Sequence, residues 1–416
     1  MARVLFTALG SYGDLYPYLA IGVCLRGLGH EVTIASSTAF REKVESQYLD
    51  FAPIRPDISL ENREMMAYLF HQRLGTERVL REVAKLARET YEDTLVPAEK
   101  ADVVITHPIT FASVLAVRKL RKPWISTVLA PMSLISAYDP PVPAPFPALV
   151  RLRKFGPSVM RAVWTLGKKA SLPWVKPVLD LQRELGLTSE GHPLFEGANS
   201  PRLVLALFSR HFAEPQPDWP SQTVLTGFPL HSSSGDLAPE LKRFLDDGPP
   251  PVVFTLGSSA VGAAGRFYAD SLDAVTRLKV RAVFLTGRHP QGLPESLPAG
   301  LMAWPYAPHA LVFARAAAIV HQGGIGTTAQ GLMSGHPSLV VPFAHDQFDN
   351  AERVRRMHAG LSLPRPKYNA RTAEEALRRL LHDKRYVEGA GGIAAKLRVE
   401  DGALSAARTI VEMLRR

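Results

Sequence analysis

The chain has 416 residues, more than one hydrophobic core normally serves, so two domains of about 200 residues are expected. Its hydrophobic content of 46% with 21% charged residues indicates a folded soluble protein, and the single cysteine, Cys24, excludes a disulfide framework and fits a reducing compartment. The formal net charge of +10 favours an anionic partner such as nucleic acid, a membrane surface or a phosphorylated substrate.

The first apolar run, residues 4–8, is too short for a signal peptide and leads directly into a glycine turn. We interpret it as the first strand. No stretch approaches the roughly 20 apolar residues of a membrane-spanning helix, so a cytoplasmic protein is expected.

Short apolar runs alternate with helical patterns along the whole chain. Helices are expected at residues 18–28 and 111–120 in the first half. Strands are expected at residues 4–8, 32–35, 51–53, 103–106, 124–128 and 203–207, and then at 252–256, 282–286, 302–304, 318–320 and 339–341. Such alternation predicts βαβ units with parallel sheets, and here it occurs twice.

Composition divides the chain between these two halves. Residues 213–235 are rich in Pro, Ser, Gln and Gly, which is typical of a linker. The sequence therefore predicts an α/β fold of two doubly wound, Rossmann-like domains facing each other across a cleft. We place an N-terminal domain at 1–215, a linker at 216–235, a C-terminal domain at 236–400 and an amphipathic helix at 401–416. A mostly helical insertion, residues 57–95, is expected to border the cleft.

The first glycine turn runs from Gly10 to Pro17 and places Asp14 at the carboxyl edge of the first sheet. A carboxylate there can accept a proton from a substrate hydroxyl, provided that burial raises its pKa toward the working pH. Alternatively, Asp14 only caps the helix that Pro17 leads.

Positive charge is concentrated in the second half of the N-terminal domain. No acidic residue occurs between Asp139 and Asp180, and three of the aromatic residues in this stretch are Phe155, Trp164 and Trp174. The basic residues are Arg151, Arg153, Lys154, Arg161, Lys168, Lys169 and Lys176. This pattern fits a surface that faces anionic lipid, or else a solvated basic face whose tryptophans belong to the core. No nucleic-acid-binding module accompanies the charge, so nucleic acid is not expected.

A second glycine turn follows the first strand of the second half, where Gly257, Ser258 and Ser259 end an apolar run. Its hydroxyls suit a phosphate, although such a transition is common. No GxGxxG follows the first strand of either half and no GxxxxGK[ST] occurs, which disfavours a dehydrogenase and a P-loop protein.

Residues 318–350 carry the most specific pattern. An apolar run ends in His321 and is followed by Gly323, Gly324, Gly326 and Thr327 before a helical stretch. Glycines let the backbone approach a ligand closely, and a helix N-terminus attracts phosphate.

The neighbouring strand of this segment ends in a polar loop with Asp346 and Gln347. Such a loop can hold whatever is joined to the phosphate. The segment thus predicts a site for a diphosphate joined to a hydroxyl-rich group, although His321 could be structural and Asp346 could cap a helix. No cluster has metal-ligand spacing, so no metal is expected.

Two motifs carry a resemblance to a known family. GSYGDLYPYLAIGVCLRGLGHEVTIAS and HQGGIGTTAQGLMSGHPSLVVPFAHDQFDNAERV are similar to the two signatures of GT-B glycosyltransferases of family 1, in the bacterial branch with antibiotic, sterol and rhamnolipid enzymes. GFPL, FTLGSS and AHDQFDNAERV most resemble the rhamnosyltransferase of rhamnolipid synthesis and its relatives.

The resemblance implies a role for several residues. Asp14 occupies the position of the catalytic base, and Asp346 and Gln347 fall where the family holds sugar hydroxyls, with Asn350 nearby. The diphosphate is expected at Ser258, His321, Gly324, Gly326 and Thr327. The segment Tyr306, Ala307, Pro308, His309 aligns with a Trp-x-Pro-Gln motif in plant members.

Two departures from the plant pattern concern the nucleoside. Tyr306 would replace the tryptophan that stacks on the base, which leaves uracil and thymine undecided. Ala329 stands where plant members carry a ribose-binding glutamate, so ribose contacts must come from elsewhere.

One hypothesis follows from overlaying the motifs. Plant members orient their catalytic histidine with an aspartate at the end of a later strand, and His107 follows the strand at residues 103–106. We hypothesise an Asp14–His107 dyad with its members exchanged. The alternative is a histidine that lines the acceptor pocket.

The expected function is an inverting, metal-independent glycosyltransferase that moves a sugar from a UDP- or dTDP-sugar to a hydroxyl of a lipophilic acceptor. The nucleotide sugar would be a co-substrate, with no cofactor. Apolar walls would come from the insertion and from the proline loop, residues 139–143, and the basic stretch could contact the inner face of a membrane. The alternatives are a rhamnosyltransferase using dTDP-rhamnose and a hydroxy-fatty acid, a nucleotide-sugar 2-epimerase, and a non-catalytic GT-B-like binding or activator protein.

Overall fold

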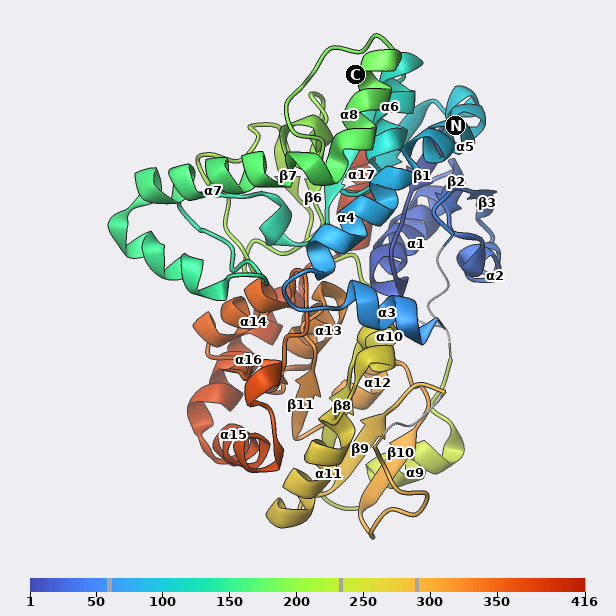
Figure 1. The fold of residues 1–416 in the computed structure, drawn as a ribbon. Helices are drawn as coiled ribbons and strands as arrows, with labels where there is room; N and C mark the ends of the chain where they lie inside the picture. The colour runs from blue at the N-terminus through green and yellow to red at the C-terminus, as the bar shows by residue number, and fades with distance from the viewer. Residues whose placement is uncertain (58–61, 232–234, 289–291, 416) are drawn as a thin grey trace.

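The computed structural model of the protein describes residues 1–57, 62–231, 235–288 and 292–415. Figure 1 shows two α/β domains one above the other, each built around a parallel sheet with helices on both faces. The two halves predicted from alternating patterns are therefore confirmed as two doubly wound domains. No helix among these residues is both long and apolar enough to span a bilayer.

The N-terminal sheet has seven strands in the order β3-β2-β1-β4-β5-β6-β7. Its strands are β1 Arg3–Thr7, β2 Glu31–Ser36, β3 Asp50–Pro53, β4 Val103–Thr106, β5 Trp124–Val128, β6 Val204–Ala206 and β7 Thr223–Leu225. Successive residues of β1 enter different cores: Val4 and Phe6 pack on one face, and Leu5 packs on the other. Burial of both faces explains why these strands are continuous apolar runs.

The C-terminal sheet has six strands in the order β10-β9-β8-β11-β12-β13. Its strands are β8 Val252–Thr255, β9 Ala282–Leu285, β10 Leu301–Trp304, β11 Ala318–His321, β12 Ser338–Val340 and β13 Gly360–Ser362. In β8, Phe254 packs on one face of the sheet and Val253 on the other. The strand order reverses between β8 and β11, where open α/β sheets place their ligands.

Helices of the N-terminal half connect and cover its strands. They are η1 Thr38–Phe40, α2 Arg41–Glu45, α6 Phe111–Lys119, η2 Pro131–Ser133 and η5 Glu196–Ala198. A projecting segment consists of η3 Pro147–Phe155 and α7 Pro157–Ser171, followed by η4 Leu172–Val175 and α8 Lys176–Glu184. In Figure 1, α7 extends sideways from the body of the molecule.

Helices of the C-terminal half do the same for the second sheet. They are α9 Pro239–Asp246, α10 Gly257–Ala260, η6 Val261–Ala263, α11 Phe267–Leu278, α12 His309–Phe313, α13 Ile325–Ser334, α14 Gln347–Arg356, η7 Arg365–Lys367, α15 Ala370–His382 and α16 Lys384–Leu397.

Two short edge strands, β7 and β13, were not predicted. β7 lies inside the segment whose composition indicates a linker, yet it continues the first sheet by pairing Val204 with Thr223 and Ala206 with Leu225. Three-residue strands carry too little apolar pattern to stand out beside Pro and Gly. The N-terminal sheet therefore extends to Leu225, beyond the predicted domain boundary at 215.

The last helix, α17 Gly402–Arg415, returns to the N-terminal domain and packs on α1 Tyr12–Gly27. Its Ala406, Ala407 and Ile410 are buried in the first core. The sequence-based division of the chain also separates this helix, at 401–416, from the C-terminal domain.

The insertion forms α3 Arg63–Leu69, α4 Gly75–Lys85 and α5 Ala87–Lys100. Helix α3 lies between the two sheets in Figure 1 and contacts η6 of the C-terminal domain. Phe70, directly after α3, packs against the C-terminal core. The insertion thus borders the space between the domains, as predicted.

Candidate functional site

Asp14 lies in the first turn of α1, which begins at Tyr12 rather than at the predicted residue 18. Ser11 is the N-cap, and its backbone N–H and hydroxyl donate to Oδ2 of Asp14 at 2.7 and 3.0 Å. This capping box starts the helix early. Gly10 has a φ of +126°, and a Cβ there would clash with the Asp14 carboxylate. Asp14 does cap its helix, but only one of its oxygens is used in this way.

The other oxygen of Asp14 faces His107, which follows β4. Nε2 of His107 lies 3.2 Å from Oδ1 of Asp14. The backbone N–H of Ile109 donates to Nδ1 at 3.3 Å, so the proton of a neutral imidazole is on Nε2 and points to Asp14. The side chain of His107 is 5% exposed and that of Asp14 34%. The predicted pair is therefore adjacent, with the carboxylate as its accessible member.

The electrostatics of Asp14 differ from the sequence-based expectation. Burial by itself raises the pKa of Asp14. The hydrogen bond and charge of His107, together with the hydrogen bonds from Ser11, lower this pKa by more than burial raises it. The net pKa lies below the ordinary value of an aspartate. The condition that burial raises this pKa toward the working pH is therefore not met, because His107 and Ser11 stabilise the charged form, and Asp14 can accept a proton only as a weaker base.

The second glycine turn opens onto the N-terminus of α13. Gly324 precedes this helix, and within the described residues no side chain caps it, which leaves backbone N–H groups for a ligand. Gly323 has a φ of +93°, and a Cβ there would lie 2.7 Å from Cγ1 of Val340. Only glycine allows this turn.

His321 is fully buried beneath the turn. Its Nδ1 accepts the backbone N–H of Gly323 at 3.1 Å, and its Nε2 has no hydrogen-bond partner among the residues that the structure describes. Burial, with a smaller contribution from the neighbouring His309, lowers the pKa of His321 to about 3, so the imidazole is neutral. Gly331 of α13 lies next to Nε2. Direct contact of His321 with a phosphate stays a prediction.

Gln322 belongs to this site although it was not predicted. Its side chain is 5% exposed, and its Oε1 is buried without a partner in the described parts of the chain. A Cβ on Gly257 would clash with Nε2 of Gln322, and one on Gly324 would lie 3.0 Å from it. The amide thus lies between the two glycine turns. The signal in the sequence is a polar residue inside a glycine-rich turn.

The remaining predicted phosphate-side residues are placed as follows. Gly326 and Thr327 lie in the first turn of α13, and Thr327 is buried. Ser258 is exposed in α10, and the side chain of Ser259 lies outside the described residues. Ala329 is buried in α13 and packs in a core cluster.

Asp346 and Asn350 connect the sugar-side loop to the glycine turn. Nδ2 of Asn350 donates to Oδ2 of Asp346 at 2.7 Å and to the carbonyl of Gly323 at 2.8 Å. Asp346 precedes α14, but its side chain makes no capping hydrogen bond there. The structure therefore does not support the capping alternative.

Gln347 has a supporting position instead. It is buried, and its Oε1 accepts the backbone N–H groups of Phe343 and Ala344 at 2.8 and 3.1 Å. The side-chain amide oxygen of Gln347 therefore stabilises the conformation of this loop. Sugar binding by Gln347 stays a prediction.

Asp346 has a strongly perturbed carboxyl group. Burial and, to a smaller extent, the negative charge of Asp14 raise its pKa to about 7, against the lowering effect of the Asn350 hydrogen bond. The two carboxylates therefore influence each other although they belong to different domains. Perturbed titration in a cleft is typical of functional sites.

The predicted base-binding segment follows β10. Tyr306 is 59% exposed, and its hydroxyl lies near that of Tyr16 in α1. Ala307 is buried in a core cluster, while His309 stacks on Phe313 at 4.7 Å with its Nε2 3.4 Å from Oγ1 of Thr255. Tyr306 is thus the accessible aromatic ring of this segment, whereas Ala307 belongs to the core.

His345 is a second residue that was not predicted. It has a φ of +55°, which non-glycine residues rarely adopt. Its ring meets Phe70 edge-on at 5.1 Å, and its Nδ1 lies 3.4 Å from Oγ1 of Thr76. His345 therefore joins the insertion to the loop that carries Asp346. The positive φ of His345 marks it as unusual, and no pattern in the sequence indicates this backbone conformation.

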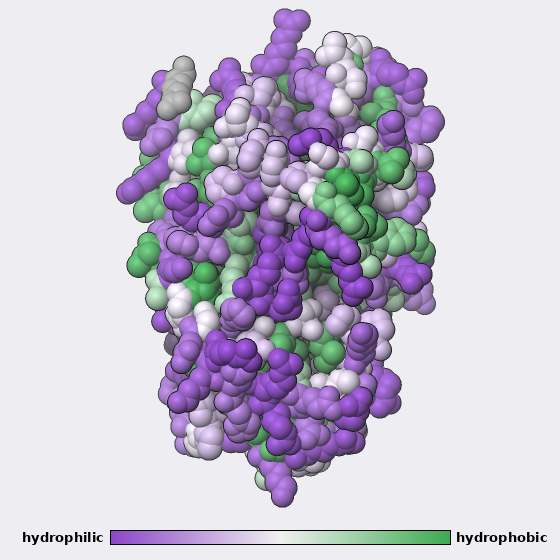
Figure 2. Space-filling view, turned by 90° about the vertical axis from the view of Figure 1, so that its left-hand side faces the viewer, coloured by the Kyte–Doolittle hydropathy of each residue, from purple (hydrophilic) through white to green (hydrophobic). Residues whose placement is uncertain are grey.

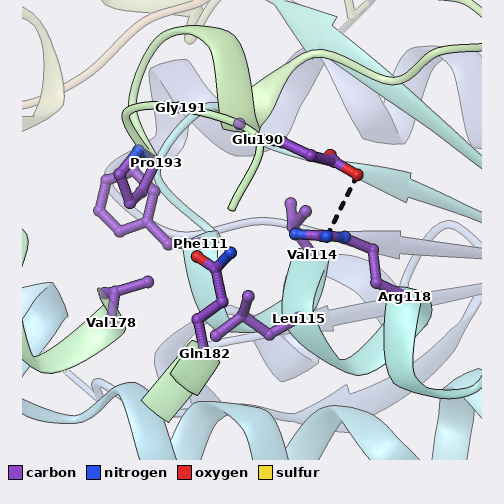
Figure 3. Close-up of a pocket in the computed structure, with 10 residues that line it drawn as sticks. Phe111, Val114, Leu115, Arg118, Val178, Gln182, Glu190, Gly191 and Pro193 are labelled. Carbon is purple, nitrogen blue, oxygen red and sulfur yellow. Dashed lines mark ion pairs between the residues drawn. The ribbon is translucent and has the colours of Figure 1, made fainter. Parts of the chain in front are cut away.

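Two hollows lie away from these residues. One, shown in Figure 3, is lined by Phe111, Val114 and Leu115 of α6 together with part of α8, and an ion pair of Arg118 and Glu190 at 3.1 Å borders it. The other lies beside Arg365 and Tyr368. None of the predicted site residues lines either hollow. In the described part of the chain, no group of three or more His, Cys, Asp or Glu side chains could hold a metal ion.

Two family models match the chain. Residues 4–125 match the glycosyltransferase family 28 N-terminal domain, and residues 270–413 match the C-terminal domain of proteins like erythromycin biosynthesis protein CIII. The first match lies within the N-terminal sheet, from β1 to the start of β5, and the second includes the C-terminal sheet from β9 to β13.

Curated relatives align over nearly the whole chain. An O-mycaminosyltylonolide 6-deoxyallosyltransferase of Streptomyces fradiae is 30% identical over 386 residues, covering 90% of this chain and 88% of the relative. A sterol 3-beta-glucosyltransferase of Yarrowia lipolytica is 27% identical over 429 residues, covering 98% of this chain but 29% of the relative. The chain thus spans less than a third of that sterol enzyme.

Solved structures share the fold. The calicheamicin glycosyltransferase CalG4 has a TM-score of 0.73 at 17% identity, covering 100% of this chain and 99% of that one. The spinosyn rhamnosyltransferase SpnG, solved with thymidine diphosphate, has a TM-score of 0.72 at 18% identity, with 98% and 100% covered.

Proposed function

Because the chain belongs to the GT-B glycosyltransferases of family 1, we propose that it transfers a sugar from a UDP- or dTDP-sugar to a hydroxyl of a lipophilic small molecule or lipid. The observation that carries this proposal is the position of the charged Asp14, backed by His107, opposite the uncapped start of α13. Helix α1 contacts α13 directly, so the base and the diphosphate site belong to one interface.

The proposed reaction inverts the anomeric carbon. The acceptor oxygen attacks this carbon from the face opposite the diphosphate, and the bond between the carbon and the phosphate oxygen breaks. The hydroxyl proton passes to Oδ1 of Asp14, while Nε2–H of His107 fixes the orientation of the carboxylate. The backbone N–H groups at Gly324–Thr328 stabilise the negative charge on the departing nucleoside diphosphate.

Neither a metal nor a cofactor is part of this proposal. The nucleotide sugar is a co-substrate, and preorganised backbone dipoles with Gln322 provide the positive end of the site. Closure of both domains over the sugar would exclude water and suppress its hydrolysis.

For the donor, we favour a dTDP-sugar. The thymidine diphosphate named for the spinosyn relative supports this choice, and a rhamnosyl donor is the finer alternative. Tyr306 would stack on the base, with its hydroxyl near that of Tyr16.

For the acceptor, we propose a lipophilic alcohol, because the insertion and the proline loop carry apolar side chains between the two domains. Phe70 and Met66 come from the insertion, and Val142 and Ala144 come from the proline loop and its next residue. The sterol and antibiotic names of the relatives support an apolar acceptor. A hydroxy-fatty acid remains within this class.

We also propose that the segment from η3 to α7 contacts an anionic membrane surface, on the inner face if the protein is cytoplasmic. Phe155 and Leu166 are exposed there beside basic residues. Figure 2 views the side from which α7 projects, and it shows a mainly hydrophilic face with separate hydrophobic patches. Lys168 is paired with Glu196, which makes Arg161 and Lys169 the better probes. Unchanged binding to phosphatidylglycerol vesicles after R161Q and K169Q would contradict this contact.

A thermal-shift screen of UDP- and dTDP-sugars tests the donor site, because a ligand that binds only the folded state raises the melting temperature. The true donor should then give a glycosylated product with an alcohol acceptor. Conversion of the sugar alone would indicate an epimerase. Nucleotide-sugar binding without turnover, unaffected by D14N, would favour a non-catalytic binding or activator protein.

A further inference from the structure

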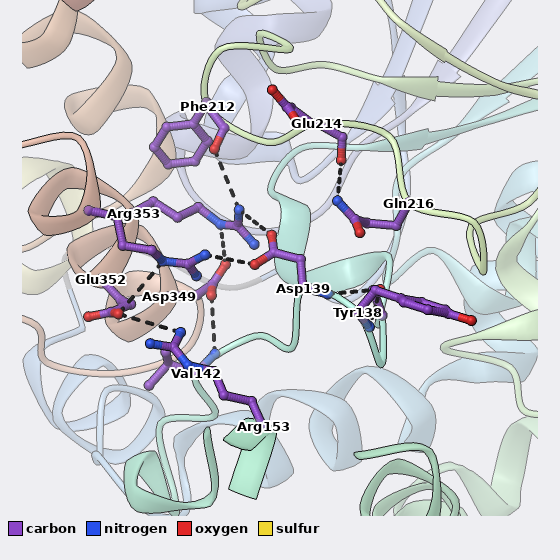
Figure 4. Close-up of polar contacts among 12 residues, drawn as sticks. Tyr138, Asp139, Val142, Arg153, Phe212, Glu214, Gln216, Asp349, Glu352 and Arg353 are labelled. Carbon is purple, nitrogen blue, oxygen red and sulfur yellow. Dashed lines mark hydrogen bonds and ion pairs between the residues drawn. The ribbon is translucent and has the colours of Figure 1, made fainter. Parts of the chain in front are cut away.

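The proline loop of the N-terminal domain is joined to α14 of the C-terminal domain by charged groups (Figure 4). The carboxylate of Asp139 accepts from NH1 of Arg353 and from NH1 of Arg356, each at 2.7 Å. Asp139 and Arg353 are 214 positions apart in the sequence. Their contact therefore depends on the relative position of the two domains.

Arg353 is almost completely buried, with 4% of its surface exposed. Two carboxylates pair with its guanidinium, although the one from its own helix would neutralise the charge. Its Nε donates to Asp349, one turn earlier in α14, at 2.8 Å, and its NH1 lies 3.5 Å from the carbonyl of Phe212. Asp349 alone could neutralise the guanidinium. The second carboxylate comes from the other domain, so the charge of Arg353 is shared across the interface.

Two further contacts join the proline loop to α14. The backbone N–H of Val142 donates to Oδ1 of Asp349 at 3.1 Å, and the side chains of Val142 and Ala144 pack with Phe348. The proline loop thus contacts the beginning of α14 by a hydrogen bond and an apolar contact, and the second half of the same helix by the ion pairs of Asp139 with Arg353 and Arg356.

The beginning of α14 is also where the sugar-side residues lie. Asp346 immediately precedes the helix, and Asn350 ties Asp346 to Gly323 of the glycine turn. Residues 346–350 therefore lie between the glycine turn on one side and the proline loop on the other.

We propose that Arg353 is a positioning residue, through which the proline loop holds Asp346 and the donor sugar in line with the acceptor hydroxyl at Asp14. The inference rests on the proposed glycosyl transfer and deepens it. The contact between Asp139 and Arg353 determines how much of the donor sugar reaches the alcohol rather than water. An ion pair that only stabilised the fold would not change this partition.

The test replaces Asp139 by asparagine, which keeps the side-chain volume and leaves Asp349 to pair with Arg353. In D139N, the ratio of donor hydrolysis to alcohol transfer should rise about tenfold and the acceptor KM should increase, because a small misplacement of reacting groups is costly. The dissociation constant of dTDP or UDP, measured by calorimetry, should stay within twofold. E184Q, which removes a solvent-exposed ion pair with Arg88, is the matched control.

A D139N protein that is folded, binds the nucleotide and partitions the sugar like the wild type would overturn the inference. R353M serves as a second variant: its partition should change in the same direction as in D139N, and the opposite direction would also contradict the proposal. Absence of transfer by the wild-type protein with every donor would instead contradict the proposed function. The two failures are therefore distinguishable.

Discussion

His107 donates from Nε2 to Oδ1 of Asp14 across 3.2 Å, and the imidazole is the buried member of the pair while the carboxylate is partly exposed. The backbone N–H of Ile109 fixes this orientation by occupying Nδ1. In the proposed mechanism, Asp14 is therefore the group that takes the acceptor proton, and His107 orients the carboxylate and lowers its pKa.

Loss of the imidazole should therefore change the pH dependence of the reaction. The His107 hydrogen bond and charge lower the pKa of Asp14, so H107A raises that pKa and moves the acid limb of kcat/KM to higher pH. H107Q, which can still donate a hydrogen bond, should recover part of the difference. D14N should reduce kcat by about 10²-fold or more, as expected for loss of a general base. A pH–rate profile of H107A that matches the wild type would end the dyad hypothesis.

Gln322 should contribute to nucleotide affinity. Its Nε2 lies between Gly257 and Gly324, where a diphosphate would meet the start of α13. A hydrogen bond to a charged group contributes about 1.5–3 kcal/mol, so Q322L should weaken dTDP or UDP binding by about tenfold or more. Isothermal titration calorimetry measures this change. A Q322L protein with wild-type affinity would exclude Gln322 from the diphosphate site.

Asp346 should leave a signature in the pH dependence of stability. Burial raises its pKa from 3.8 to about 7, so within this range the folded protein holds a proton that the unfolded chain has released. This group therefore makes the protein less stable as pH rises from about 4 to about 7. In D346N the free energy of unfolding should fall less over that range. Parallel urea titrations at several pH values provide the measurement, and equal slopes would contradict the raised pKa.

The C-terminal helix should stabilise the N-terminal domain. Ile410 is completely buried in the first core, so I410A should lower the free energy of unfolding by about 2–5 kcal/mol. R408A, at an exposed position in the same helix, is the control and should change it by less than about 0.5 kcal/mol. Urea denaturation distinguishes the two. An equal, small effect of both variants would mean that α17 does not belong to this core.

The long strands could be predicted from sequence because both faces of each sheet are buried, as in β1 and β8. The short strand β7 could not, since three residues at a sheet edge carry no apolar run. Its neighbours, Pro220 and Gly227, instead indicate a linker.

The site was predictable where a turn needs glycine, at Gly10 and Gly323, and where strand ends bring side chains together, as for Asp14 and His107. Three features were not predictable. The lowered pKa of Asp14 depends on three hydrogen bonds, one from His107 and two from Ser11. The backbone angle of His345 has no pattern in the sequence, and the Asp139–Arg353 contact joins residues of different domains.

The chain crosses between the domains twice, and the two crossings touch. On its way out it passes Gly227 and Phe228, and on its return it passes Glu400 and Gly402, where a Cβ would clash with the backbone at Phe228. Glu400 also accepts a hydrogen bond from Ser209 at 2.8 Å. Because both crossings hold the domains together at one place, we expect rotation at this point to be the easiest relative motion of the domains. A circular permutant opened near residue 401 would lose that constraint, and its domains would be free to separate in other directions.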